Sequence, residues 1–66
     1  MEVTVNGEKR SYDGPMTLLG VVESLGLRPG SVAVERNLVI VPRKGMDREM
    51  IRDGDAIEII RPVGGG

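Results

Sequence analysis

A single stretch of helical periodicity interrupts a chain whose other apolar residues alternate as they do in β-strands. This stretch places apolar residues at the i, i+3, i+4 and i+7 spacing of one helix face: Leu18, Val21, Val22 and Leu25. Thr17 is a candidate N-cap, and Gly26 can end the helix in the left-handed conformation. The sequence therefore predicts one main helix, over about residues 17–25, that covers one face of a sheet.

The chain before this helix predicts a β-hairpin. Residues 1–5 alternate apolar and polar side chains, which is the pattern of a half-buried strand. Asn6-Gly7 is a strong hairpin signal because both residues tolerate a positive φ. We expect the second strand of this hairpin to return through about Tyr12.

The chain after the helix predicts two strands and then a polar segment. Residues 31–36 and 37–42 form strand-like runs around Asn37, and Pro42 ends the second run or places it at a sheet edge. Residues 43–51 are predicted to be a loop or a short helical turn, with Met46 and Met50 as core fillers. The cations in and beside this segment are interpreted as solvated: Arg43, Lys44, Arg48 and Arg52.

A turn at residues 52–55 precedes the last predicted strand. Its two aspartates lack a third ligand, so a turn is a better interpretation than a calcium loop. In the strand that follows, Ile57 and Ile59 share one face. The other face carries Glu58, Ile60 and Pro62.

The order of these elements, β-β-α-β-β-β, predicts an α+β fold of the β-grasp (ubiquitin-like) type. A right-handed crossover through the helix makes the strands that it joins parallel, with the first and last strands side by side. We expect a mixed four- or five-stranded sheet with one main helix packed on one face. A small SH3-like barrel has no place for the helix. The predicted domain covers residues 1–63, and residues 64–66 form a flexible glycine tail.

Composition excludes several classes of function. The chain of 66 residues has no cysteine and no histidine, so it offers no thiol nucleophile, no zinc–thiolate site and no histidine base. The net charge of −1 does not indicate a nucleic-acid partner. No apolar run approaches the ~20 residues that span a bilayer, and no signal peptide precedes the first strand. We expect a non-enzymatic, cytoplasmic protein with no nucleic acid, membrane or metal partner.

The glycine tail has two interpretations. Gly64, Gly65 and Gly66 follow an apolar strand-like run, and glycine loses more conformational freedom on ordering than any other residue. A disordered end or a cloning scar is the simpler explanation. The other explanation is that the terminal carboxylate is the working group.

Several stretches together resemble the ThiS family, the small ubiquitin-like sulfur carriers of thiamine biosynthesis. The resemblance spans the whole chain and includes the stretches TLLGVVESLGL, AVERNLVIVPR and DGDAIEIIRPVGGG. The small subunit of molybdopterin synthase and ubiquitin-like protein modifiers share the fold and the diglycine end. They are the alternative functions.

The resemblance to ThiS implies a role for the end of the chain. An E1-like adenylyltransferase (ThiF type) would consume ATP to adenylylate the carboxylate of Gly66, and a persulfide donor would convert it to a thiocarboxylate. Thiazole synthase (ThiG type) would then take the sulfur. Gly64 and Gly65 would thread the tail into the partners' active sites, and the chain itself would bind no cofactor. The candidate contacts to partner proteins are Ile60, Pro62 and Val63.

Overall fold

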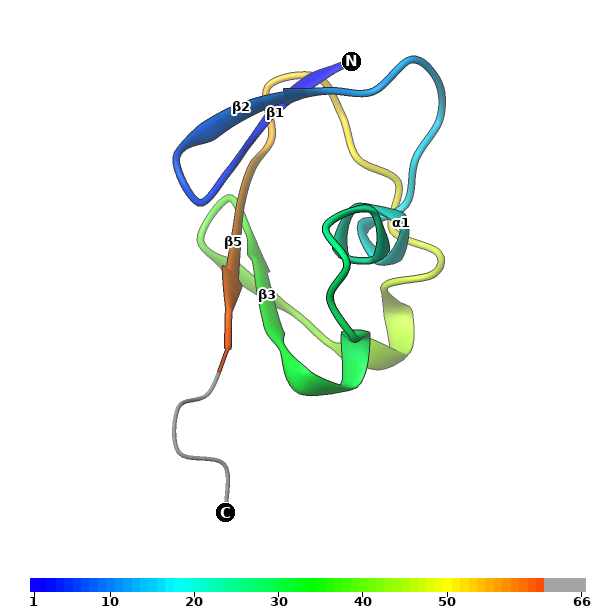
Figure 1. Cartoon of the computed structure of the whole chain (residues 1–66), viewed down its shortest axis with the longest axis vertical. Helices are drawn as coiled ribbons and strands as arrows, with labels where there is room; N and C mark the ends of the chain where they lie inside the picture. The colour runs from blue at the N-terminus through cyan, green and yellow to red at the C-terminus, as the bar shows by residue number, and fades with distance from the viewer. Residues whose placement is uncertain (62–66) are drawn as a thin grey trace.

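The structure is a computed structural model, and it describes residues 1–61. Five strands, one α-helix and two short 3-10 helices follow one another along the chain (Figure 1). Their bounds, in chain order, are β1 (Glu2–Val5), β2 (Glu8–Ser11), α1 (Leu18–Ser24), η1 (Pro29–Ser31), β3 (Ala33–Arg36), β4 (Val39–Val41), η2 (Arg43–Gly45) and β5 (Ala56–Ile60). The helical turn η2 agrees with the prediction for the polar segment after Pro42.

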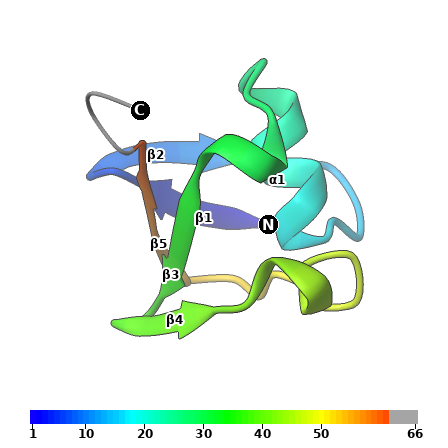
Figure 2. The same cartoon turned by 90° about the horizontal axis from the view of Figure 1, so that it is seen from below.

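The strands form one mixed sheet in the order β2-β1-β5-β3-β4. The first and last strands, β1 and β5, pair in parallel at its centre, and each outer pair is an antiparallel hairpin. Strand β5 also pairs antiparallel with β3. Helix α1 lies on one side of this sheet (Figure 2). The predicted β-grasp fold, with five strands and one main helix, is confirmed.

Both hairpins turn through two consecutive residues with positive φ. In the first hairpin these are Asn6 (φ 50°) and Gly7 (φ 83°), as predicted. In the second they are Asn37 (φ 52°) and Leu38 (φ 69°). A leucine is rare in this conformation because its Cβ crowds the backbone, so the second turn is strained. The turn also takes up the first two residues of the predicted run 37–42, which is why β4 is shorter than expected.

Helix α1 begins as predicted and ends one residue early. The hydroxyl of Thr17 accepts a hydrogen bond from the backbone N–H of Gly20 at 3.0 Å, so Thr17 is the N-cap. Leu25 is the C-cap, and Gly26 follows with φ 75° in the left-handed region. The helix has seven residues. Within residues 1–61, no helix has the length and apolar character needed to cross a membrane.

The core lies between α1 and the sheet. It consists of aliphatic side chains and one methionine: Val3, Val5, Leu18, Val21, Val22, Val34, Met46, Ile51, Ile57 and Ile59. Met46 is buried as predicted, but the prediction for Met50 is wrong, since this residue is 44% exposed. Met50 pairs with Thr17 in an extended bridge, and neighbouring residues of an extended segment point in opposite directions. Ile51 takes the inward position, so Met50 faces out.

Candidate functional site

Strand β5 leads directly to the glycine end of the chain, so its environment defines the candidate site. Ile57 and Ile59 are buried against α1, whereas Glu58 and Ile60 face outward, with Ile60 48% exposed. The predicted faces of this strand are therefore correct. The other predicted site residues lie outside the described residues: Pro62, Val63, Gly64, Gly65 and Gly66.

Ile60 lies on the face of the sheet opposite α1. Directly opposite residues of an antiparallel pair share a face, so the register places Ala33 beside Ile60 and Glu35 between Glu58 and Ile40. Ile40 is 70% exposed. This open face, defined as Ala33, Glu35, Ile40, Glu58 and Ile60, combines three apolar side chains with two glutamates that lie directly opposite each other in the register. Neither glutamate forms an ion pair within residues 1–61.

The end of β5 nearest the glycines is held by the side chain of Asn6. The Oδ1 atom of Asn6 accepts a hydrogen bond from the N–H of Ile59 at 2.7 Å. Its Nδ2 atom donates to the carbonyl oxygen of Ile59 at 3.2 Å. The Asn6-Gly7 pattern predicts only a turn, and no sequence signal predicts these two bonds.

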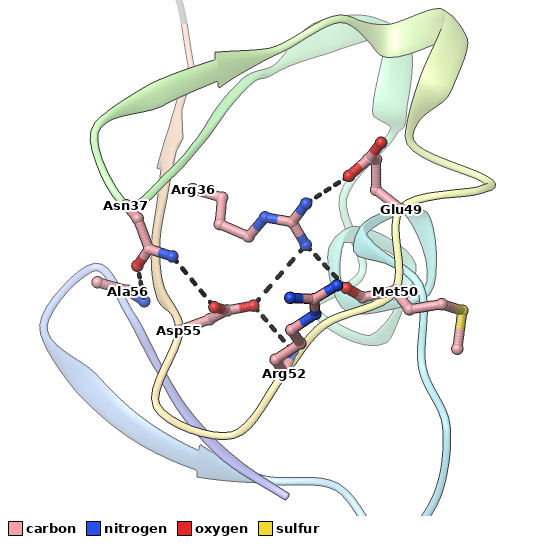
Figure 3. Close-up of polar contacts among 7 residues, drawn as sticks. All are labelled: Arg36, Asn37, Glu49, Met50, Arg52, Asp55 and Ala56. Carbon is pink, nitrogen blue, oxygen red and sulfur yellow. Dashed lines mark hydrogen bonds and ion pairs between the residues drawn. The ribbon is translucent and has the colours of Figure 1, made fainter.

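The start of β5 is held in the same way by Asn37. Its Oδ1 atom accepts from the N–H of Ala56 at 2.9 Å, and its Nδ2 atom donates to Oδ1 of Asp55 at 3.1 Å (Figure 3). The two asparagines that turn the hairpins are thus the residues that tie the two ends of the central strand to its neighbours.

A polar cluster lies beside the start of β5 (Figure 3). Asp55 is 7% exposed, and its carboxylate accepts from the backbone N–H of Arg52 at 2.8 Å. Arg36 approaches Asp55, forms an ion pair with Glu49, and donates to the carbonyl oxygen of Met50 at 2.8 Å. The other aspartate of the turn, Asp53, accepts from the N–H of Glu2 at 2.7 Å. Both carboxylates therefore accept hydrogen bonds from backbone N–H groups, and the prediction of a turn is confirmed.

A shallow groove of about 390 Å³ runs along the edge strand β4, on the side of Arg36. It is lined by Arg36, Asn37, Val39, Ile40, Val41, Pro42 and Glu49. The two charged residues of its lining, Arg36 and Glu49, form an ion pair with each other. The groove is less suited to a functional site than the open face beside β5.

The sequence pattern of the ThiS family matches residues 3–66. The chain belongs to the ThiS family. Among solved structures, the crystal structure of the thiamine biosynthesis protein ThiS from Geobacter metallireducens superposes with a TM-score of 0.84 at 32% identity, with both chains covered completely. This match shows that the two proteins share the β-grasp fold over their whole length. Membership of the family supports a sulfur carrier role.

Two relatives of this ThiS-family protein are named thiazole synthase. The protein from Paramagnetospirillum magneticum is 41% identical over 66 residues, and that from Magnetococcus marinus is 36% identical over 66 residues. The whole chain is covered in both comparisons, but it spans only 20% of the length of each relative. Each of these relatives thus contains a ThiS-like region within a much longer polypeptide.

Proposed function

We propose that this ThiS-family protein is a sulfur carrier that donates sulfur for thiazole formation in thiamine biosynthesis. The observation that carries the proposal is the family match over residues 3–66, which includes the glycine end. The carrier group is the α-carboxylate of Gly66, which requires Gly66 to be the last residue of the working protein.

The proposed chemistry activates this carboxylate and then exchanges one of its oxygens for sulfur. The carboxylate attacks the α-phosphate of ATP, pyrophosphate leaves, and a mixed anhydride with AMP forms. The terminal sulfur of a persulfide displaces AMP to give an acyl disulfide. A thiol then cleaves the sulfur–sulfur bond, which leaves the thiocarboxylate and a disulfide on the donor.

Partner proteins supply the catalytic groups for these steps. In this proposal the chain, which has no cysteine or histidine of its own, is a protein cosubstrate rather than an enzyme. An E1-like adenylyltransferase of the ThiF type binds the ATP and carries out the first step. The carrier binds no cofactor itself. Gly64 and Gly65 thread the tail into each active site, since a residue without Cβ is narrow and accepts any backbone conformation that a channel imposes.

Thiazole synthase of the ThiG type is the proposed acceptor of the sulfur. Two relatives named thiazole synthase contain a region similar to this chain, which supports a functional link between a carrier of this kind and that enzyme. In this proposal the thiocarboxylate sulfur attacks a substrate that is held by the synthase.

The open face of the sheet is the proposed docking surface for these partners. It is continuous with the end of β5, and it presents Ile60 with no covering element from residues 1–61. Two like charges directly opposite each other on a sheet are unfavourable. Glu35 and Glu58 therefore favour a partner that brings a basic side chain between them, surrounded by apolar contacts to Ile40 and Ile60. Pro62 and Val63 would extend this contact towards the tail.

Mass spectrometry of the intact protein tests the proposal. The purified chain, which must end at Gly66, is incubated with the adenylyltransferase, ATP and a persulfide donor. We expect a mass increase equal to replacement of one oxygen by sulfur, located by fragmentation on Gly66. Conjugates with lysine side chains in the native cell would instead indicate a ubiquitin-like modifier. Sulfur transfer to a pterin precursor would indicate a molybdopterin synthase subunit, and an unmodified end would refute all three.

A further inference from the structure

Strand β5 extends further along the sheet than its parallel neighbour β1. Within residues 1–61, the last residues of β5 therefore have no backbone partner on the β1 side. Strand β1 stops at Val5, where the chain turns away through Asn6-Gly7, while β5 continues to Ile60. The last backbone bond between them runs from the N–H of Asn6 to the carbonyl oxygen of Ile57 at 2.9 Å. Beyond it, the N–H and C=O of Ile59 face the place where β1 would have continued.

The amide side chain of Asn6 lies in this place. It accepts from the N–H of Ile59 at 2.7 Å and donates to its carbonyl oxygen at 3.2 Å. A primary carboxamide presents one acceptor and one donor side by side, so it can bond the N–H and the C=O of a single residue at once. The side chain therefore takes the place of the backbone groups that further residues of β1 would have offered to Ile59.

The opposite side of β5 is held at the next residue. Ile60 pairs with Ala33 of β3, so Ile59 and Ile60 are fixed from two directions. Without the side chain of Asn6, the backbone of this end would be hydrogen-bonded within residues 1–61 only to β3. An end held on one side frays more readily, and the point from which the glycine tail starts would then move relative to the docking surface.

We infer that Asn6 is a positioning residue for delivery of the tail, an inference whose kinetic part rests on the proposed function. Asn6 bonds the backbone of Ile59, the second-last residue of β5, and so holds the strand end from which the chain continues towards the tail. Since a displacement of about 1 Å can reduce the rate of a positioned reaction on the order of a hundredfold, a loose end of β5 slows adenylylation even when the domain stays docked and folded.

The test compares two asparagine-to-glycine variants, because Asn37 provides a matched control. Asn6→Gly and Asn37→Gly both keep a residue that tolerates the positive φ of the turn, and both remove a pair of bonds to one end of β5. They differ in which end of the strand is released. Asn6→Asp is a second variant, which keeps the acceptor and replaces the donor with an oxygen that faces the carbonyl of Ile59.

Amide hydrogen exchange measures directly how strongly the backbone N–H of Ile59 is protected by its hydrogen bond. We expect the Ile59 amide to exchange at least about tenfold faster in Asn6→Gly than in the wild type, since its acceptor is lost. In Asn37→Gly the Ala56 amide should exchange faster instead, and the Ile59 amide should exchange at the wild-type rate. Wild-type protection of Ile59 in Asn6→Gly, which has no acceptor at this position, would overturn the inference.

ATP–pyrophosphate exchange with the adenylyltransferase measures the effect of each substitution on the rate of adenylylation. At a temperature where all variants are folded, we expect Asn6→Gly and Asn6→Asp to lower kcat about tenfold with little change in KM, and Asn37→Gly to leave both near wild type. Equal losses in Asn6→Gly and Asn37→Gly would reduce Asn6 to a purely structural role and overturn the inference. If the wild-type protein itself supports no exchange of pyrophosphate, the proposed function fails, and the exchange rate of the Ile59 amide alone decides whether Asn6 holds this strand.

Discussion

The guanidinium of Arg36 lies 3.8 Å from the carboxylate of Asp55, at the start of the strand that leads to the glycine end. This carboxylate also accepts from Asn37 and from the backbone N–H of Arg52. The turn before β5 is therefore fixed by one buried charge and its partners, and the stability of the domain should depend on that charge.

Asp55→Ala should destabilise the protein by about 2–4 kcal/mol, because it leaves the amide of Asn37 and the backbone N–H of Arg52 without their acceptor and removes the negative charge beside Arg36. Urea denaturation followed by circular dichroism measures the change. Asp53→Ala is the matched control in the same turn. It removes an exposed bond to the N–H of Glu2 and should lower stability by only about 1 kcal/mol. Equal effects of the two substitutions would contradict a special role for Asp55.

The helix stripe should carry much of the packing energy. Leu18 is completely buried, and Leu18→Ala should lower the free energy of unfolding by about 2–4 kcal/mol through the cavity that it leaves. Val22→Ala, which removes less volume, should cost about 1–2 kcal/mol. Thermal denaturation of both variants is the measurement. A melting temperature equal to that of the wild type for both would mean that α1 does not cover the core.

The second hairpin turn should be improved by glycine. Leu38 has φ 69° and is 89% exposed, so its side chain adds strain without burial. Leu38→Gly should raise stability by about 0.5–1 kcal/mol, since Asn-Gly suits a turn with two positive φ angles. Ile40→Gly, on the adjacent strand, is the control and should lower stability by a similar amount. A loss of stability in Leu38→Gly would indicate that the leucine makes contacts that outweigh the strain.

Local patterns were sufficient for most of the fold but not for the contacts that fix β5. The periods of two and 3.6 predict which residues of β5 and α1 face the core, because those periods follow from backbone geometry alone. The bonds of Asn6 join residues 53 positions apart, and the ion pair of Arg36 and Glu49 joins residues 13 apart. Such pairs depend on how the strands are ordered in the sheet, and no local pattern contains that information.

Docking is predicted to depend on the exposed side of β5. Ile60→Asp should weaken the complex with the adenylyltransferase while leaving the fold intact, since Ile60 faces away from the core. We expect at least about a tenfold increase in Kd by titration calorimetry, the result of burying an unpaired carboxylate beside two glutamates. Leu38→Asp is the control, because it places the same charge on an exposed leucine at a hairpin turn. Equal affinities of wild type and Ile60→Asp would remove this residue from the interface.

The position of the last residue should matter more than any side chain. Every proposed step uses the α-carboxylate of Gly66, and one appended residue moves the activated carbon by about 3.5 Å. Because a misplacement of about 1 Å can reduce a rate on the order of a hundredfold, a C-terminal tag or deletion of Gly66 should abolish adenylylation. Neither change touches the core, so thermal stability should stay near that of the wild type.

Gly65→Val examines the same tail without changing its length. The β-branched side chain restricts the backbone conformations that the tail can adopt, and it makes the tail wider at the point that would enter a partner's active site. Both adenylylation and sulfur transfer should therefore be impaired. ATP–pyrophosphate exchange with the adenylyltransferase compares this variant with the tagged and shortened proteins. Gly45→Val, at the end of η2, is a control in which a glycine with open space around it receives the same side chain. Wild-type exchange from the tagged protein would refute the carrier mechanism, because no free carboxylate would then stand at the position where the activated carbon is needed.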